Sequence, residues 1–315
     1  MPKLNFASRE LQKRFYRSKN SVIKRWLSPT FNLDGWRIDV GNQTGRYRGE
    51  DLHDNVMREI RQAMNDVKPN TWLVAENADM WASDLNGSGW DGTMNYNGFM
   101  RPLWAWFNHK PNLATGGFHG LPINIPKTTG WQFLQAMTAF NSSIPWRALI
   151  ESMTLLDSHD TARMRNVVGG DKEKHLAAMG MLLTYPGVPS IFAGDELGLE
   201  GAWGEDARRT MPWDEKWDVE FLDHVKTLIK VRKNAPALIE GGLRWVDVDD
   251  DYLLYLRESK KQNLLILVAR DKCTVNIDLT RYGYKVSKTL FGPEQKGSAI
   301  KLKLANGTAA IWEVA

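Results

Sequence analysis

The chain has 315 residues, 43% of them hydrophobic, which is enough to bury the core of one large domain and a smaller one. Its 41 basic and 37 acidic residues are interspersed and leave a net charge of +4, and no basic cluster with interleaved aromatic residues argues for a nucleic-acid partner. No apolar run approaches the roughly 20 residues of a membrane span, and Met1–Asn20 lacks a signal-peptide core. We therefore expect a soluble, cytoplasmic protein with neither a nucleic-acid nor a membrane partner.

The N-terminal part of the chain alternates between helical and strand-like patterns. An amphipathic helix is predicted over Ser8–Trp26 and a strand over Phe31–Asp39. A second helix, predicted over Asp51–Val67, is ended by Pro69, and the strand Trp72–Glu76 follows directly. This order of helix and strand is typical of parallel α/β proteins.

The same alternation continues to residue 236. After a polar loop that begins near Ser83, we expect three further strands, at Gly92–Tyr96, Met153–Asp157 and Val188–Ala193. Helical periodicity predicts three further helices, at Trp131–Phe140, Lys172–Leu183 and Val219–Lys233. The first part of the chain thus has five strand candidates before Pro236.

Beyond Pro236 the pattern changes to short segments rich in β-forming residues and separated by turn residues. These segments are Leu243–Val248, Tyr252–Glu258, Asn263–Ala269, Thr274–Leu279, Ala299–Leu302 and Ala309–Val314. They predict an antiparallel β-sandwich. We therefore expect two domains, an α/β catalytic domain over residues 1–237 and an all-β domain over residues 238–315.

Three acidic residues, Asp39, Glu76 and Asp160, each end or follow an apolar run. In a βα barrel the chemistry lies where each strand meets the loop that follows it. Taken singly, such an acid is usually a cap, a turn residue or an ion-pair partner. Three of them at barrel spacing, with Arg37 and His159 close by in the sequence, favour a catalytic site.

Four runs carry a family resemblance. They are GWRIDVGNQ at Gly35–Gln43, LVAEN at Leu73–Asn77, LLDSHD at Leu155–Asp160 and GVPSIFAGDELGLEG at Gly187–Gly201. Together they resemble the signatures of the alpha-amylase family, family 13 of the glycoside hydrolases. The opening MPKLN at Met1–Asn5 is similar to a motif of the neopullulanase and cyclomaltodextrinase branch. The final β domain would correspond to the family's domain C.

The resemblance implies a retaining mechanism, in which two carboxyl groups lie about 5–5.5 Å apart. Asp39 would be the nucleophile, Glu76 the general acid and then the base, and Asp160 would hold sugar hydroxyls in the transition state. Arg37 lies two residues before Asp39, so both side chains point to the same side of the strand, and Arg37 would keep Asp39 ionised. His159 would donate a hydrogen bond to a substrate hydroxyl.

The expected function is hydrolysis of α-glucosidic bonds in malto-oligosaccharides or related α-glucans, the predicted substrate. Transglycosylation is the nearest alternative, because a sugar hydroxyl can intercept the same covalent intermediate. A truncated, inactive or carbohydrate-binding remnant is an alternative of a different class. The sequence leaves the bond type, α-1,4 or α-1,6, and the oligomeric state open.

The strand count departs from a complete barrel, which has eight strands. The five candidates match the family's fourth to eighth strands, and the first three have no counterpart in this chain. We therefore predict a partial (β/α)8 TIM barrel that lacks its N-terminal part, followed by the β-sandwich. An open half-barrel exposes strand edges, so we expect the chain to be a fragment of a longer protein.

Two further sequence features are less specific. The run Asp84–Gly89 resembles a calcium loop, but its twelfth position is Asn95 where a bidentate Glu is expected. We interpret it as a polar loop and expect no cofactor, leaving calcium open only for a longer parent protein. Glu196 is expected to hold neighbouring loops and to take no part in catalysis.

Overall fold

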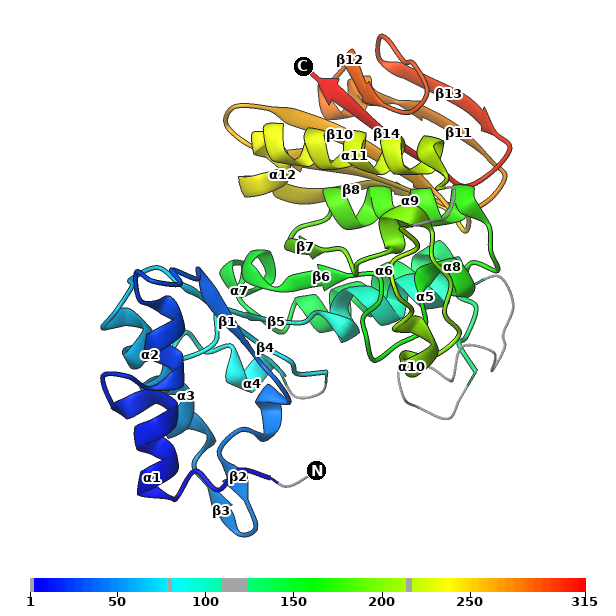
Figure 1. Ribbon diagram of the computed structural model, residues 1–315. Coiled ribbons are helices and arrows are strands. Elements are labelled where there is room, and N and C mark those ends of the chain that lie inside the picture. The colour runs from blue at the N-terminus through cyan, green and yellow to red at the C-terminus, as the bar shows by residue number, and fades with distance from the viewer. Residues whose placement is uncertain (1–2, 79–80, 109–123, 214–216) are drawn as a thin grey trace. The chain divides into compact units, whose positions relative to one another are not determined.

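The computed structural model describes residues 3–78, 81–108, 124–213 and 217–315 (Figure 1). These residues form two compact units. Unit 1 contains the described residues of 1–97 and 140–153, and unit 2 those of 98–139 and 154–315. The first two residues of the Met1–Asn5 motif lie outside the described part of the chain.

Unit 1 contains a parallel sheet in the order β1-β4-β5. Strand β1 is Gly35–Ile38, β4 is Trp72–Ala75 and β5 is Gly92–Thr93. Pairing aligns Ile38 with Ala75, so β1 and β4 end at the same level. The parallel arrangement predicted from the helix–strand alternation is confirmed for these strands.

The helices of unit 1 cover one face of this sheet. Helix α3 spans His53–Asn65, and its apolar stripe packs with Ile38 and Leu73 in one core. The single helix expected over Ser8–Trp26 was wrong. The structure has α1 at Arg9–Gln12, a π-helical turn at Lys13–Arg17 and α2 at Val22–Leu27. The break occurs because the Ser18 hydroxyl and amide both bond the Lys13 carbonyl and end the first segment.

Short elements complete unit 1. They are the 3-10 turn Gly41–Gln43, the hairpin strands β2 (Arg46–Tyr47) and β3 (Glu50–Asp51), α4 (Trp81–Asp84) and α7 (Trp146–Glu151). Met94, just after β5, forms an isolated parallel bridge with Met153. That bridge continues the parallel pattern at the start of the next strand.

Unit 2 begins with a helical part around two short strands. Strands β6 (Met153–Leu155) and β7 (Val188–Ser190) pair with each other. The π-helical turn Tyr96–Met100, helix α6 (Gly130–Asn141) and β6 each have residues in both units. The remaining elements are α5 (Arg101–Phe107), α8 (Met164–Val167), α9 (Lys172–Thr184), the 3-10 turn Asp195–Leu197, α10 (Gly204–Ala207), α11 (Val219–Asn234) and α12 (Pro236–Glu240).

The C-terminal part of unit 2 is all β apart from a 3-10 turn at Leu279–Tyr282. A five-stranded antiparallel sheet has the order β12-β14-β10-β9-β8, and β11 pairs with β13. The strands are β8 (Gly242–Val248), β9 (Tyr252–Glu258), β10 (Asn263–Ala269), β11 (Cys273–Asp278), β12 (Val286–Phe291), β13 (Ala299–Leu304) and β14 (Thr308–Val314). This confirms the predicted antiparallel sheet, and only β12 was not expected.

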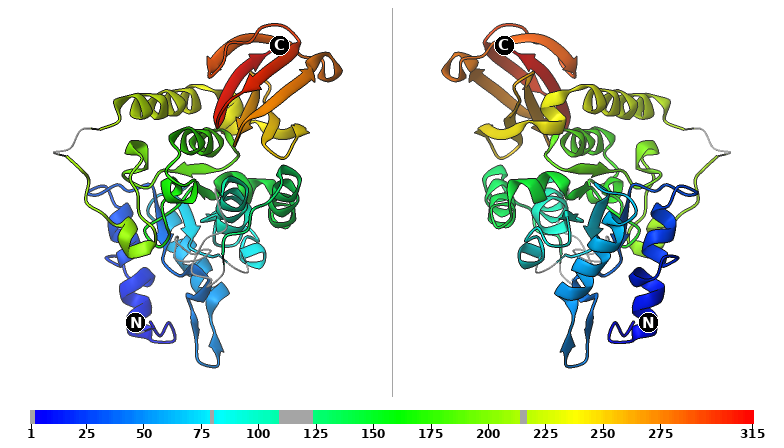
Figure 2. Two further views of the ribbon diagram at one scale, coloured as in Figure 1. Left: turned by 90° about the vertical axis from the view of Figure 1, so that its right-hand side faces the viewer. Right: turned by 90° about the vertical axis from the view of Figure 1, so that its left-hand side faces the viewer.

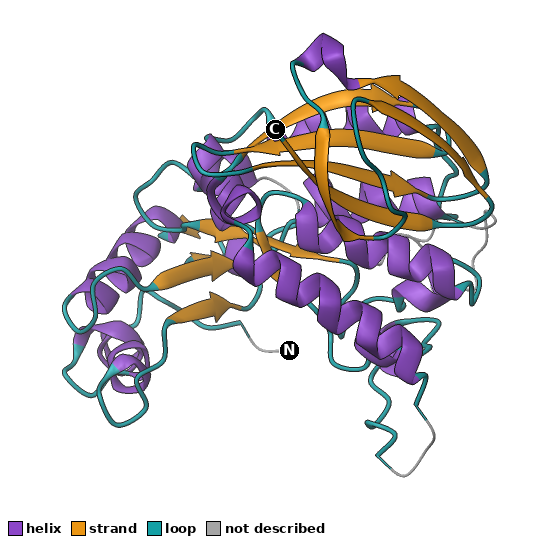
Figure 3. Ribbon diagram, turned by 90° about the horizontal axis from the view of Figure 1, so that it is seen from above, coloured by secondary structure: helices purple, strands orange, loops and turns teal. Residues whose placement is uncertain are grey.

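The two C-terminal sheets enclose one apolar core. Figure 2 shows the C-terminal strands, coloured from yellow-orange to red, in two further views. Leu265 and Trp312 of the larger sheet pack with Val275 and Ile300 of the smaller one. Helices lie beside the long strands of the C-terminal part (Figure 3), and α9 contacts the opposite face of the larger sheet. There, Gly180 of α9 lies against Ala309 of β14. None of the helices in the described part of the chain is long and apolar enough to cross a membrane.

Candidate active site

In unit 1, Asp39 and Glu76 occupy equivalent positions directly after neighbouring parallel strands. The Glu76 amide donates to the Ile38 carbonyl at 3.0 Å, which extends the β1–β4 ladder by one residue. The two carboxylates therefore project from the carboxyl edge of one sheet, where active sites of α/β proteins form. The side chain of Asp39 is 68% exposed and that of Glu76 is 20% exposed.

Arg37 connects the two carboxylates. Its Nη1 donates to Asp39 Oδ1 at 2.5 Å, and its Nη2 lies 3.0 Å from Glu76 Oε2 as an ion pair that lacks hydrogen-bond alignment. The guanidinium is three-quarters buried and also contacts the sulfur of Met94. One fixed positive charge thus lies between two carboxylates, and it orients both.

The backbone after Asp39 is strained. Val40 has φ 45° and ψ 47°, the left-handed region that a β-branched residue rarely adopts. This turn aims the Val40 amide at Glu76 Oε2, to which it donates at 2.8 Å. It also brings Gly41 so close to β4 that a Cβ would lie 2.7 Å from the Ala75 Cβ. Strain of this kind is common at functional sites, where surrounding contacts hold it.

A buried polar group that the sequence did not predict lies next to Glu76. Asn77 donates to Asp84 Oδ2 at 2.9 Å, and Asp84 Oδ1 lies 3.3 Å from His53 Nε2. The other His53 ring nitrogen is 2.7 Å from the Thr44 carbonyl. Burial lowers the pKa of His53, but the bonds to Asp84 and Thr44 outweigh it and the pKa is raised. Asp84 ends α4, within the run that we interpreted as a polar loop, and its contacts with His53 and Asn77 account for an acidic residue at this buried position.

In unit 2, His159 and Asp160 lie in the loop after β6. Asp160 Oδ1 is 3.0 Å from Arg208 Nη2, and Arg208 Nε donates to the His159 carbonyl at 2.7 Å. His159 Nε2 lies 3.2 Å from Asp160 Oδ2. Arg208 therefore holds both predicted residues. No sequence pattern singled it out, since it belongs to a loop far along the chain.

Below this loop lies a buried group that includes Arg163 and Asp195. Arg163 Nη1 donates to Asp195 Oδ1 at 2.7 Å, and the guanidinium stacks on Phe192 at 4.1 Å. Glu196, next in the chain, accepts from the Gly194 amide at 2.8 Å. This bond lies within one turn, so the expectation that Glu196 holds neighbouring loops stays a prediction.

The structure brings the five predicted residues together in two sets. Arg37, Asp39 and Glu76 contact one another in unit 1, whereas His159 and Asp160 contact each other in unit 2. Among the residues that the structure describes, no cluster of three or more His, Cys, Asp and Glu side chains is arranged to hold a metal ion.

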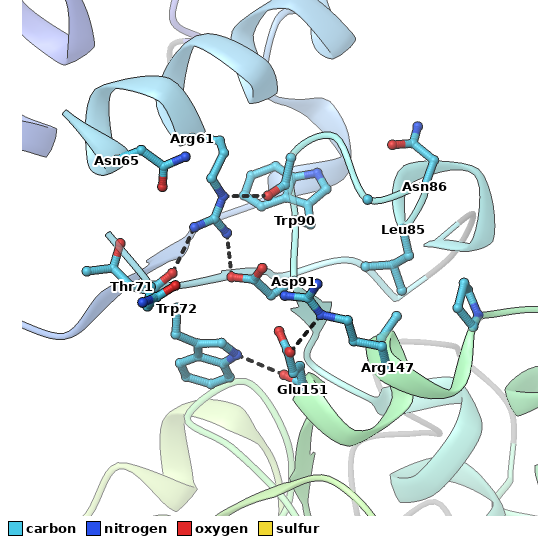
Figure 4. Close-up of a pocket in the computed structure, with 15 residues that line it drawn as sticks. Arg61, Asn65, Thr71, Trp72, Leu85, Asn86, Trp90, Asp91, Arg147 and Glu151 are labelled. Carbon is cyan, nitrogen blue, oxygen red and sulfur yellow. Dashed lines mark hydrogen bonds and ion pairs between the residues drawn. The ribbon is translucent and has the colours of Figure 1, made fainter. Parts of the chain in front are cut away.

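A pocket of about 610 Å³ in unit 1 lies at the opposite end of β4 from Glu76 (Figure 4). Arg61 donates there to the Thr71 carbonyl and pairs with Asp91, while Arg147 pairs with Glu151 at 3.0 Å. The Trp72 indole donates to the Glu151 carbonyl at 2.8 Å. None of the five predicted residues lines this pocket, and these four charged groups neutralise one another, so we do not assign the chemistry to it.

The sequence matches the model of a known protein family. The family model described as "Alpha amylase, catalytic domain" matches residues 1–252. Cyclomaltodextrinase of Geobacillus thermopakistaniensis (strain MAS1) is 30% identical over 285 residues, which cover 89% of this chain and 43% of that protein. Neopullulanase 2 of Thermoactinomyces vulgaris is 30% identical over 313 residues, 96% of this chain and 48% of that protein.

Two further similar proteins support the same family. Intracellular maltogenic amylase of Bacillus subtilis is 29% identical over 287 residues, 89% of this chain and 43% of that protein. The acarbose-soaked debranching enzyme of Nostoc punctiforme superposes with a TM-score of 0.76 at 26% identity, covering 92% of this chain and 59% of that one. The chain spans less than half the length of these three curated relatives. Because the family model matches well over half of the chain, the protein belongs to the alpha-amylase family.

Proposed function

We propose that this chain carries the catalytic carboxylates of a retaining α-glycosidase that acts on malto-oligosaccharides or related α-glucans. The observation that supports this most strongly is the Arg37 guanidinium between Asp39 and Glu76 at the ends of two neighbouring parallel strands. The printed names of the relatives, which include a cyclomaltodextrinase and a maltogenic amylase, support the substrate class.

The proposed reaction has two steps. In the first, the Asp39 carboxylate attacks the anomeric carbon while the Glu76 carboxyl gives its proton to the glycosidic oxygen; the bond to the leaving sugar breaks and an ester to Asp39 forms. In the second, Glu76 takes a proton from water, and the water oxygen displaces Asp39. Both steps require the two carboxylates to face one sugar, an arrangement that a shared Arg37 favours.

His159 and Asp160 would bind hydroxyls of the same sugar. Asp160 retains an exposed carboxylate beside Arg208, and His159 is half-exposed, so both can reach a ligand. Interactions that strengthen in the transition state, such as those of Asp160 with a distorted ring, raise turnover.

We further propose that β1, β4, β5, β6 and β7 are the fourth to eighth strands of a (β/α)8 barrel, with the catalytic domain over 1–237 and the β domain over 238–315. The short coverage of the relatives supports a part of a longer barrel. The word "intracellular" in the name of one relative supports a cytoplasmic location. Transglycosylation by the same intermediate, and a non-catalytic carbohydrate-binding remnant, are the alternatives.

The test measures nitrophenol release from a nitrophenyl α-maltoside. The chain is assayed alone and after co-expression with the part of the Geobacillus cyclomaltodextrinase that it does not span. We expect activity mainly in the co-expressed sample, because the missing strands would complete the site. Asp39→Asn should then lower turnover on the order of 10³-fold or more, since the nucleophile is lost.

Asp34→Asn is the matched control, because Asp34 precedes the same strand and its side chain is 96% exposed. Unchanged turnover in Asp39→Asn would sink the assignment. Near-normal turnover by the chain alone would contradict the partial barrel. Chromatography of the products from maltotriose separates hydrolysis from transfer, which yields sugars longer than the substrate.

A further inference from the structure

Three ionisable side chains of unit 2 are buried at the base of the loop that carries His159 and Asp160. Asp157, Arg163 and Asp195 are 2%, 1% and 1% exposed, respectively. Asp157 follows β6, Arg163 ends the loop, and Asp195 lies after β7. Burying a charged group is unfavourable unless the charge is paired, so the partners of each group indicate which of them can be ionised.

The acceptors outnumber the donors in this group. Asp157 Oδ2 accepts from the Met164 amide at 2.6 Å, whereas Asp157 Oδ1 has no donor among the residues that the structure describes. Asp157 and Asp195 are buried near each other, and each carboxyl shifts the pKa of the other through its side chain. Two ionised carboxylates only accept hydrogen bonds, so a hydrogen bond between these two groups requires a proton on one of them.

The charge balance leads to the same conclusion. Arg163 forms an ion pair with Asp195 Oδ1 and so neutralises one of the two carboxylates. If both acids were ionised, one negative charge would remain buried without a partner. Burial, and then the neighbouring charge of Asp157, raise the pKa of Asp195 well above its ordinary value, and burial raises the pKa of Asp157.

We propose that Asp157 and Asp195 share one proton at neutral pH, and that this pair and Arg163 position the loop of residues 157–163. Within the described part of the chain, the shared proton rests on the burial of both acids, on the single ion pair of Arg163 with Asp195, and on the unpartnered Asp157 Oδ1. The positioning of His159 and Asp160 for catalysis rests on the proposed function.

The geometry explains how the group would hold the loop. The bond from the Met164 amide to Asp157 closes the loop at its base. The Arg163 side chain donates to the carbonyls of Ala193 and Ala207, both at 3.0 Å, which ties the loop to two other segments of unit 2. Asp157, Arg163 and Asp195 would be positioning residues, because none of them is proposed to touch substrate.

Infrared spectroscopy of the 315-residue chain at pH 7 tests the shared proton. The carbonyl stretch of a protonated carboxyl is resolved from that of a carboxylate, and we expect one such absorption in the wild-type protein. Asp157→Asn and Asp195→Asn should each remove it, because an amide replaces the acid and can donate the same hydrogen bond. Asp206→Asn should leave it, because Asp206 pairs with Arg209 at the surface and its pKa is lowered.

The absence of the absorption in the wild-type protein, or its persistence in both amide variants, would overturn the shared proton. Each amide variant tests the pair separately, so one that fails to fold does not remove the test.

Amide hydrogen exchange at Met164 tests the hold on the loop. We expect Asp157→Ala to lose protection there and Asp157→Asn to keep it, because the amide oxygen still accepts. Equal protection in both variants would contradict the positioning role. In the co-expressed enzyme, Asp157→Ala should lower kcat roughly 10- to 100-fold with little change in KM, and Asp157→Asn should restore it.

These outcomes separate the two proposals. An inactive wild-type enzyme with the carboxyl absorption present would contradict the glycosidase assignment and leave the shared proton supported. An active enzyme whose Asp157→Ala variant keeps its kcat would contradict only the positioning role.

Discussion

Val40 has a strained backbone, and its amide contacts the proposed general acid Glu76. Its left-handed conformation directs an amide to Glu76 and places Gly41 against the end of β4. Holding a β-branched residue there costs about 1–3 kcal/mol. The side chain is 44% exposed, so it contributes little packing in return.

Val40→Gly should therefore raise the free energy of unfolding of unit 1 by about 1 kcal/mol, since relief of strain exceeds the entropy cost of glycine. Urea unfolding followed by tryptophan fluorescence measures the change. Val22→Gly is the matched control, because Val22 is 41% exposed but helical, and there glycine should destabilise by about 1 kcal/mol. A destabilised Val40→Gly variant would contradict the strain.

The pairing of His53 with Asp84 makes a pH dependence measurable. The folded state raises the pKa of His53 above 6.5, so it binds the proton more tightly than the unfolded chain does. The stability from this pair is fully present below the unfolded pKa and is lost as pH rises through the folded pKa.

We therefore expect the unfolding free energy to fall between about pH 6 and pH 8, and to fall less in Asp84→Asn, which lacks the ion pair. Urea titrations at several pH values measure both slopes. Asp54→Asn is the control, because Asp54 lies in the first turn of the same helix without that pairing. An identical slope in Asp84→Asn and the wild-type protein would exclude His53 as the source.

At the scale of elements, helix α9 packs closely enough to exclude a methyl group. A Cβ on Gly180 would lie 2.3 Å from the Ala309 Cβ of β14. The sequence predicted this helix almost to the residue, although helix propensity alone disfavours a glycine within it. Only the packing against the sheet shows why a residue without a side chain occurs there.

Gly180→Ala should destabilise unit 2 by about 1–2 kcal/mol, because overpacking outweighs the gain in helix propensity. Thermal or urea unfolding measures the change. Gly49→Ala, with no atom within 4 Å of the added Cβ, should change stability by less than about 0.5 kcal/mol. A stabilised Gly180→Ala variant would mean that α9 and β14 separate easily.

Two of the elements for which local pattern failed show a physical reason. The periodicity of Ser8–Trp26 predicted one helix, but hydrogen bonds of Ser18 end the first segment. Strand β12, Val286–Phe291, was missed because it has a mixed polar pattern and two register irregularities against β14. A strand of this kind is held by its ladder partner more than by its own residues.

At the scale of the whole chain, a buried cation joins the C-terminal sheet to the helices that precede it. Arg257 of β9 donates to the carbonyls of Thr184, Leu238, Gly241 and Gly242. Burial lowers the pKa of Arg257 to about 10, so the group stays charged at neutral pH. All of these acceptors belong to unit 2. Three of them, Leu238, Gly241 and Gly242, directly follow the expected domain boundary at residue 237.

Arg257→Leu should lower the unfolding free energy of unit 2 by about 3–5 kcal/mol, because four carbonyls lose a buried donor. Calorimetry should show the loss as a lower transition temperature. Arg244→Leu on the neighbouring strand should cost at most about 1 kcal/mol, since its pair with Glu258 is solvent-exposed. Equal effects would show that the buried network adds no stability.

The sequence by itself predicted the parallel strands β1, β4 and β5, the antiparallel C-terminal sheet and the family, because hydrophobic periodicity and short motifs are local properties. It also identified Arg37, Asp39 and Glu76, which lie where strand ends predict them. Tertiary structure alone decided that one guanidinium contacts two carboxylates, that Asp84 pairs with His53, and that Asp157 and Asp195 are buried near each other. These arrangements bring together residues from separate segments, and no local pattern encodes which buried polar groups will meet when the chain folds.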